Sequence, residues 1–239
     1  MIADLSATDP HGGGQLHHAG AAVPGAGLGL VLLHGRGGSA ADILGLAGLL
    51  RRPDTAALAP EALGHSWWPV SFLAPMAQLD PWLNSALAAV DRAVAAFDAA
   101  GLPRQRLILG GFSQGACLAL EWAARRGGPL GGVVGFSGGL VGTADAPGGG
   151  DPQLYGHPPK AMDQTGRLDG VPVWLGCHEA DPHIPRARVE ETERVLTALG
   201  ADVTCRLYPG AGHGLTQADV AALRRMADGV RPSPPPENG

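Results

Sequence analysis

Cysteine is scarce in this sequence, and its distribution excludes two common ways of building a small domain. There are three cysteines in 239 residues, Cys117, Cys177 and Cys205. An odd number at scattered spacing argues against a disulfide framework, and no C-x-x-C pair or cysteine–histidine cluster has the spacing of a zinc site. We therefore expect three buried thiols that act as small hydrophobic side chains, and no metal.

Lysine and long apolar runs are also scarce. Lys160 is the only lysine, the formal net charge is −5, and the arginine pairs lie far apart. This pattern argues against a nucleic-acid partner. No apolar stretch approaches the length of a membrane span, and the first basic residue is Arg36, too late for the charged start of a secretory signal. We therefore expect a cytoplasmic protein.

What is present fits one globular domain. Hydrophobic residues make up 45% of the chain, and no polar linker divides it. We assign residues 27–230 to the domain. Residues 1–26 are rich in glycine, alanine and histidine, and we interpret them as a lead-in of surface loop or short edge strands, which fits their clustered histidines better than a metal site does. Residues 231–239 contain four prolines and are predicted to be disordered.

Short apolar runs alternate with stretches of helical periodicity. The runs that are typical of buried parallel strands occupy residues 28–33, 56–59, 106–110, 132–136, 171–176 and 203–208. Helices are predicted after Asp80 as N-cap, after Ser113, from Pro185, and from a Thr216–Asp219 capping box. This alternation predicts a mostly parallel α/β sheet with helices on both faces, and working residues on the loops after the strands.

The pattern G-x-S-x-G occurs twice, each time after a predicted strand. It spans Gly111–Gly115 around Ser113 and Gly135–Gly139 around Ser137. Residues 116–126 favour a helix after the first copy, whereas glycines and a proline follow the second. Only Ser113 therefore has a helix whose first turn can donate N–H groups to an oxyanion. We predict Ser113 as a nucleophile on a sharp strand-to-helix turn, and Ser137 as a loop residue near the site.

A serine nucleophile needs a base and a group that orients the base. His213 lies in a glycine-flanked loop after the last predicted strand, and Asp181 follows the strand before it. Glu179 is the rival carboxylate, but Pro182 and Pro185 close to Asp181 fix its loop. The chain order serine, aspartate, histidine is the order of α/β-hydrolases.

The oxyanion is expected to meet two backbone N–H groups. One belongs to Gln114, directly after the nucleophile, and the other to a residue of His34-Gly35-Arg36-Gly37, best Arg36. The Arg36 guanidinium then points to solvent or toward an anionic group of the substrate. His34 is interpreted as a brace of this loop.

Four motifs in this order resemble the phospholipase/carboxylesterase family of α/β-hydrolases, which includes acyl-protein thioesterases and small bacterial esterases. They are His34-Gly35-Arg36-Gly37, Gly111–Gly115, Asp181–Pro185 and Tyr208–His213. The resemblance covers about residues 28–226. It implies an α/β-hydrolase fold without a large lid domain, a serine carboxylic-ester hydrolase that needs no cofactor, and often a homodimer. The family's serine, aspartate and histidine match Ser113, Asp181 and His213.

Two departures limit what the resemblance implies. Animal-type members usually have a hydrophobic residue at the position of Arg36, and the glycine-rich segment 138–170 differs from their acyl-binding loop. The match is closer to the bacterial branch, so protein depalmitoylation is not inferred.

Aromatic residues on a loop after a strand indicate a substrate pocket. We expect Trp67, Trp68 and Phe72 to line it, with Leu140 in the opposite wall. The alternative is that these side chains only cover the core. A pocket of this kind fits a short or medium acyl chain, or an aryl ester. A thioesterase or lysophospholipase with the same triad, and a non-catalytic binding protein of the same fold, are the alternatives.

Overall fold

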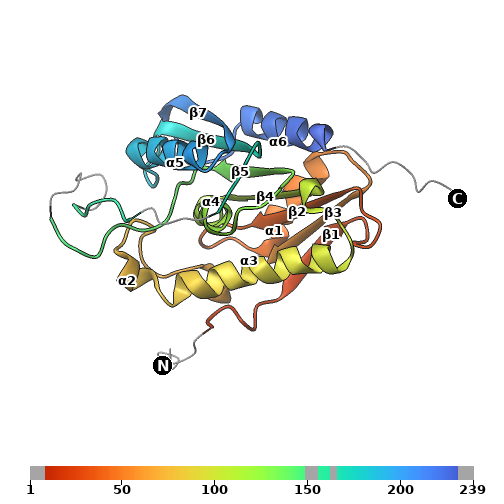
Figure 1. The fold of residues 1–239 in the computed structure, drawn as a ribbon, viewed down its shortest axis with the longest axis horizontal. Coiled ribbons are helices and arrows are strands. Elements are labelled where there is room, and N and C mark those ends of the chain that lie inside the picture. The colour runs from red at the N-terminus through yellow and green to blue at the C-terminus, as the bar shows by residue number, and fades with distance from the viewer. Residues whose placement is uncertain (1–8, 149–155, 162–165, 231–239) are drawn as a thin grey trace, which may run out of the picture.

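The computed structural model of this chain describes residues 9–148, 156–161 and 166–230. They form a central sheet with helices on both sides (Figure 1). The tail predicted for residues 231–239 and the first eight residues of the lead-in lie outside the described residues. Among the described helices, none is both long enough and apolar enough to cross a membrane.

The sheet has seven strands in the order β1-β3-β2-β4-β5-β6-β7. Only the edge strand β1 is antiparallel, and every other neighbouring pair is parallel. The prediction of a mostly parallel sheet is therefore confirmed. The strands are β1 Leu16–Gly20, β2 Leu28–Leu33, β3 Thr55–Pro60, β4 Leu107–Phe112, β5 Gly132–Phe136, β6 Pro172–Ala180 and β7 Asp202–Ala211.

Two hydrophobic clusters cover the two faces of the sheet. One face packs against α1 (Ala40–Leu49) and α6 (Gln217–Gly229). The other packs against α3 (Trp82–Ala99), α4 (Gln114–Arg126) and α5 (Arg186–Ala198). The central strands β2 and β4 are buried on both faces, which explains why their sequences are continuous apolar runs. The remaining helices are short: α2 Met76–Leu79, η1 Leu63–His65 and η2 Arg104–Arg106.

The helix ends confirm one local prediction and correct another. The Thr216–Asp219 capping box is confirmed at the start of α6. The prediction that Asp80 caps α3 is wrong, because Asp80 ends α2 and Pro81 precedes α3 without any side-chain cap. Helix α1 escaped prediction because Gly45 and Gly48 lower its helix propensity, although a capping box between Ser39 and Asp42 fixes its start.

The last two strands run further than their apolar cores. The sequence predicted 171–176 and 203–208, whereas β6 and β7 pair as far as Ala180 and Ala211, across a register shift after His178. The ends of both strands are not continuous apolar runs, and hydrogen-bonded pairing between β6 and β7 extends the strands to the same edge of the sheet. Asp181 and His213 follow directly from those ends.

Candidate active site

Ser113 lies at a sharp turn between β4 and α4. Its backbone has φ 55° and ψ −120°, the strained conformation of a nucleophile elbow. A Cβ on Gly115 would lie 2.1 Å from the Leu33 carbonyl oxygen, and one on Gly111 would lie 2.5 Å from the Gly115 carbonyl carbon. The turn therefore requires glycine on both sides of the serine, as the sequence pattern indicated.

Three side chains from distant parts of the chain form one hydrogen-bonded line. His213 Nε2 lies 2.9 Å from Ser113 Oγ, and His213 Nδ1 lies 2.8 Å from Asp181 Oδ2 and 3.0 Å from Oδ1. Because an ionised carboxylate only accepts, Nδ1 carries the proton of a neutral His213 ring. Nε2 is then left free to accept the serine proton.

Asp181 is fixed and kept ionised by its own loop. Its side chain is fully buried, and Oδ1 accepts the backbone N–H groups of His183 at 2.8 Å and Ile184 at 3.1 Å. Burial by itself raises the pKa of Asp181, but the hydrogen bonds from His213 and from the His183 and Ile184 amides outweigh it and hold that pKa below its ordinary value. The carboxylate is therefore anionic beside the imidazole at neutral pH.

The rival carboxylate, Glu179, faces away from the imidazole. It is exposed on β6, and its nearest charged partner is Arg186 at 3.8 Å. Of the two candidate carboxylates, the structure brings only Asp181 to His213.

Aromatic rings on two sides hold the His213 imidazole. The Phe112 ring lies with its centroid 5.0 Å from that of His213, and the His183 ring meets it edge-on at 4.7 Å. Beneath the same loop, a Cβ on Gly212 would lie 2.8 Å from Nε2 of His178. The two histidines that flank Asp181 in the sequence thus both pack around the loop of His213.

The loop that follows β2 lies against the elbow. A Cβ on Gly35 would be 3.3 Å from Cβ of Ser113 and equally close to Phe112. Arg36 is the next residue, and Gln114 is the first residue of α4, whose opening N–H groups have no partner within the helix. The two residues predicted to supply oxyanion N–H groups are therefore neighbours of Ser113 on different elements.

His34 holds this loop from below. Its fully buried ring accepts the Ala62 N–H at Nε2, so Nδ1 carries the proton and donates to the Gly35 carbonyl at 2.8 Å. Burial lowers the pKa of His34, which favours this neutral form. The interpretation of His34 as a brace agrees with these contacts.

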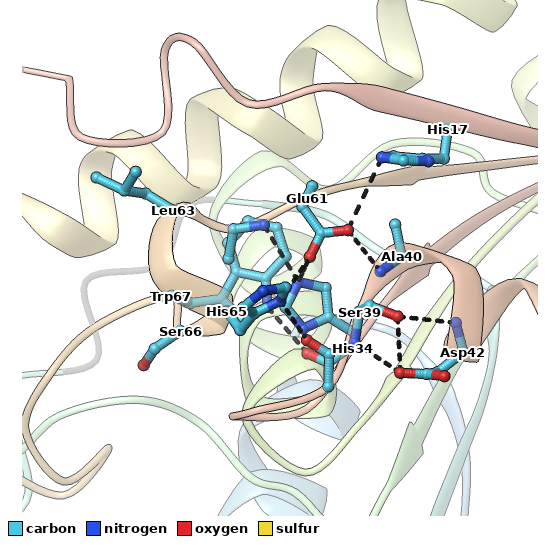
Figure 2. A network of polar contacts seen from close by, with 12 residues as sticks. His17, His34, Ser39, Ala40, Asp42, Glu61, Leu63, His65, Ser66 and Trp67 are labelled. Atoms are coloured by element: carbon cyan, nitrogen blue, oxygen red, sulfur yellow. Dashed lines mark hydrogen bonds and ion pairs between the residues drawn. The ribbon is translucent and has the colours of Figure 1, made fainter.

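A second brace escaped sequence reasoning. Glu61 follows β3 and joins the loop to the start of α1: one carboxylate oxygen accepts the Ala40 N–H at 2.9 Å, and the other lies 3.1 Å from His65 Nδ1 (Figure 2). The same imidazole reaches the Gly38 carbonyl, and the His65 carbonyl accepts the Gly37 N–H at 2.7 Å. His65 has φ 58°, which is a strained backbone for a residue with a side chain. No linear motif marks these contacts.

The Gln114 side chain ties the aromatic loop to the elbow. Its Oε1 accepts the Trp67 N–H at 2.9 Å, and its Nε2 donates to the Trp68 carbonyl at 2.9 Å. The oxygen and the nitrogen of this buried side-chain amide therefore both have hydrogen-bond partners in one loop. Sequence reasoning used only the backbone of Gln114.

An open cleft of about 670 Å³ lies over Ser113. Its lining includes Phe72, Cys117 and Trp68, although the Trp68 ring has no surface exposed to solvent. Burial raises the pKa of the Cys117 thiol to about 12, so this side chain stays protonated and apolar. The other walls are formed by residues 35–36, 69–71, 73, 112–114, 181–185 and 213.

Two residues predicted for the pocket do not line this cleft. The Trp67 ring is fully buried, donates from Nε1 to the His34 carbonyl at 2.9 Å and packs on the His11 ring. Leu140 is fully buried in the core, and its N–H donates to Thr192 Oγ at 2.9 Å. In this structure both side chains pack in the main hydrophobic core and not along the cleft.

The second G-x-S-x-G serine lies behind the site. Ser137 is buried after β5, and its N–H donates to the Gly176 carbonyl at 2.7 Å. Among the described residues between β5 and β6 there is no helix, as the glycines and proline indicated. Among the described residues, no group of histidine, cysteine, aspartate and glutamate is arranged to hold a metal ion.

Comparison with known proteins gives concordant results. A family model described as Phospholipase/Carboxylesterase matches residues 29–228. A crystal structure of a phospholipase/carboxylesterase from Dyadobacter fermentans superposes with a TM-score of 0.78 at 36% identity, covering 90% of this chain and 96% of that one.

Curated relatives are more distant. An acyl-protein thioesterase 1 from Gibberella zeae is 28% identical over 58% of this chain and 52% of its own length. A lysophospholipase-like protein 1 from Mus musculus is 29% identical over 52% of this chain and 46% of its own length. The chain thus spans about half the length of these curated relatives.

Proposed function

Since this chain belongs to the phospholipase/carboxylesterase family, we propose that it hydrolyses carboxylic esters through an acyl-enzyme on Ser113. One observation carries the proposal: the continuous hydrogen-bonded line from Asp181 through His213 to Ser113 Oγ. This arrangement has the geometry that turns a serine hydroxyl into a nucleophile. A protein that only binds its ligand has no use for it.

In the first half of the reaction, Ser113 Oγ attacks the ester carbonyl carbon while His213 Nε2 takes the hydroxyl proton. The imidazolium that forms lies between Oγ and the Asp181 carboxylate, which stabilises the new positive charge without taking the proton itself. Collapse of the tetrahedral intermediate breaks the ester C–O bond, and His213 returns the proton to the leaving alcohol.

The negative oxygen of the intermediate is stabilised by the backbone N–H groups of Arg36 and Gln114. Support comes from the position of Gln114 at the start of α4 and from the contact of Gly35 with Ser113. Donors that are fixed before the reaction need no reorganisation when the charge develops.

In the second half, a water molecule takes the place of the alcohol. His213 removes its proton as the water oxygen attacks the acyl carbonyl, and the same N–H groups bind the oxyanion. The acid then leaves as the proton passes from His213 to Ser113 Oγ, which restores the enzyme.

The cleft supports a short or medium acyl chain or an aryl ester. Its volume of about 670 Å³ suits a small molecule, and Trp68 and Phe72 give it an apolar wall. Thioester hydrolysis is the second candidate, because a curated relative is named an acyl-protein thioesterase. The same triad and oxyanion site act on either acyl bond.

Ser113→Ala tests the proposal, with Ser137→Ala as the matched control in the second G-x-S-x-G copy. We expect Ser113→Ala to lose nearly all turnover of p-nitrophenyl esters and all labelling by a fluorophosphonate, while Ser137→Ala keeps both. Retained turnover in Ser113→Ala would overturn the assignment. A panel from acetyl to palmitoyl esters, with an acyl thioester and a lysophospholipid, assigns the acyl length and the bond type.

Two finer expectations accompany the proposal. Members of the family are expected to be homodimers often, and light scattering of the purified protein tests whether this chain forms one. A cytoplasmic location is expected from the sequence, and cell fractionation tests it. Neither is needed for the mechanism.

A further inference from the structure

The cleft contains a cation for which the proposed reaction has no use. Two formally charged groups line it at neutral pH, Arg36 and Asp181. The Asp181 carboxylate is occupied by His213 and by two backbone N–H groups. The proposed mechanism uses the amide of Arg36, but its guanidinium takes no part in that chemistry.

No carboxylate of the described residues forms an ion pair with Arg36. Glu61, a carboxylate beside this loop, is held by Ala40 and His65 (Figure 2). The positive charge of Arg36 is therefore not neutralised by the protein around the cleft.

The guanidinium is nevertheless held in place. Nη1 donates to the Pro69 carbonyl at 3.1 Å, and Nη2 donates to the Val70 carbonyl. Pro69 and Val70 themselves line the cleft. A guanidinium has five N–H donors, so three remain after these two bonds. An arginine already oriented in this way loses little side-chain entropy when it binds a planar anion.

We propose that the Arg36 side chain recognises a carboxylate on the substrate, so that the preferred esters are monoanions. This rests on the proposed ester hydrolysis and names its substrate class. Arg36 and Ser113 line the same cleft, so a substrate whose carboxylate binds the Arg36 side chain can place its ester carbonyl at Ser113. A neutral ester of the same shape leaves those donors to water and reacts more slowly.

The test compares esters in which a free carboxylate is replaced by its methyl ester, which removes the charge, and follows release of the phenol from the other ester bond. One pair carries the carboxylate on the acyl side: mono(4-nitrophenyl) adipate and its methyl ester. The other carries it on the leaving group: 4-acetoxybenzoate and methyl 4-acetoxybenzoate. The quantity measured is the ratio of kcat/KM for the anionic ester to kcat/KM for the neutral ester, with Ser113→Ala supplying the uncatalysed background.

We expect Arg36→Gln to lower this ratio roughly tenfold in one of the two pairs, since a charge-assisted hydrogen bond of about 1.4 kcal/mol corresponds to a factor of ten. Arg36→Lys keeps the charge without the planar fork and is expected to give an intermediate ratio. Raising the salt concentration lowers the wild-type ratio, because the cleft is open. Arg186→Gln, which removes an exposed charge paired with Glu190, is expected to keep the wild-type ratio.

The outcomes separate the two claims. An Arg36→Gln ratio equal to the wild-type ratio in both ester pairs overturns the anion recognition. Hydrolysis no faster than that of Ser113→Ala, for every ester, overturns the proposed function itself. A drop of the same size in Arg186→Gln shows that net charge, not Arg36, sets the preference, and also overturns the inference.

Discussion

The carboxylate that faces His213 is selected by the backbone of its own loop. Asp181 and Glu179 are two residues apart, and both follow the buried part of β6. The Asp181 side chain is buried, and the His183 and Ile184 N–H groups fix its Oδ1 while Oδ2 makes the shorter contact with the imidazole. The orienting group is thus positioned before the substrate arrives.

We predict that Asp181→Asn lowers kcat by roughly 10³ to 10⁴, because an amide in that position favours the wrong imidazole tautomer. Glu179→Gln is the matched control and is expected to change kcat by less than about twofold, since its exposed ion pair with Arg186 contributes little. Steady-state kinetics on one p-nitrophenyl ester checks both. A larger loss in Glu179→Gln would assign the orienting role to Glu179.

A second residue-scale prediction concerns Glu61. Replacing it by leucine removes the acceptor for the Ala40 N–H and the partner of His65, so the loop of Arg36 loses one of its supports. We expect kcat to fall about tenfold with little change in KM, because an oxyanion N–H acts mainly in the transition state.

Two further variants make that result specific. Glu61→Gln keeps an oxygen acceptor and is expected to recover most of kcat. His17→Gln alters another neighbour of the same carboxylate, 3.8 Å away on β1, and is expected to leave kcat unchanged. A rise in KM alone in Glu61→Leu would contradict the positioning role.

At the scale of elements, the turn from β4 into α4 is compressed against the end of β2. The Gly115 backbone lies directly on the Leu33 and His34 carbonyls. This contact connects the nucleophile turn to the strand from which the oxyanion loop departs. This backbone packing therefore fixes the position of Ser113 relative to the loop that follows β2.

We predict that Gly115→Ala destabilises the protein by about 3 kcal/mol and abolishes ester hydrolysis, because the new methyl group would overlap two carbonyl oxygens. Gly45→Ala is the control: it lies exposed within α1, and a Cβ there meets nothing within 4 Å. It is expected to stabilise the protein by about 0.5–1 kcal/mol. Urea unfolding measures both, and equal stabilities of the two variants would refute the argument.

At the scale of the whole molecule, a buried ion network joins the loop after β5 to α4. Glu121 accepts from Lys160 and Arg125, and its second oxygen accepts the Val141 N–H at 3.0 Å. Burial by itself raises the pKa of Glu121, but the two cations outweigh it and hold that pKa below its ordinary value. The only lysine of the chain is therefore an internal partner.

We predict that Lys160→Met costs about 3 kcal/mol of stability, because it leaves Glu121 buried with one cation fewer. The double variant Glu121→Gln with Lys160→Met is expected to recover part of that loss, since the uncompensated charge is gone. Urea unfolding of the two single variants and the double variant measures the coupling. Purely additive losses would show that the pair does not act as a unit.

The sequence by itself determined the strands β2 to β7, their alternation with helices α3 to α6, and the candidate residues of the site, but not helix α1. Apolar runs such as residues 28–33 and 132–136 coincide closely with β2 and β5, because strands buried on both faces must be apolar throughout. The glycines around Ser113 and the loops after β6 and β7 are local features. They can be predicted from the sequence because they depend on residues that are adjacent in the chain.

Only the tertiary structure decided which side chains meet. Glu61, His65 and the Gln114 side chain hold the site through contacts between segments far apart in the chain. Trp67 packs on His11 away from the cleft, although its sequence neighbour Trp68 lines it. A sequence pattern predicts which face of a helix or strand is buried, but it does not predict which residues pack against that face. The distances among Ser113, His213 and Asp181 exist only once the sheet has placed three strand ends at one edge.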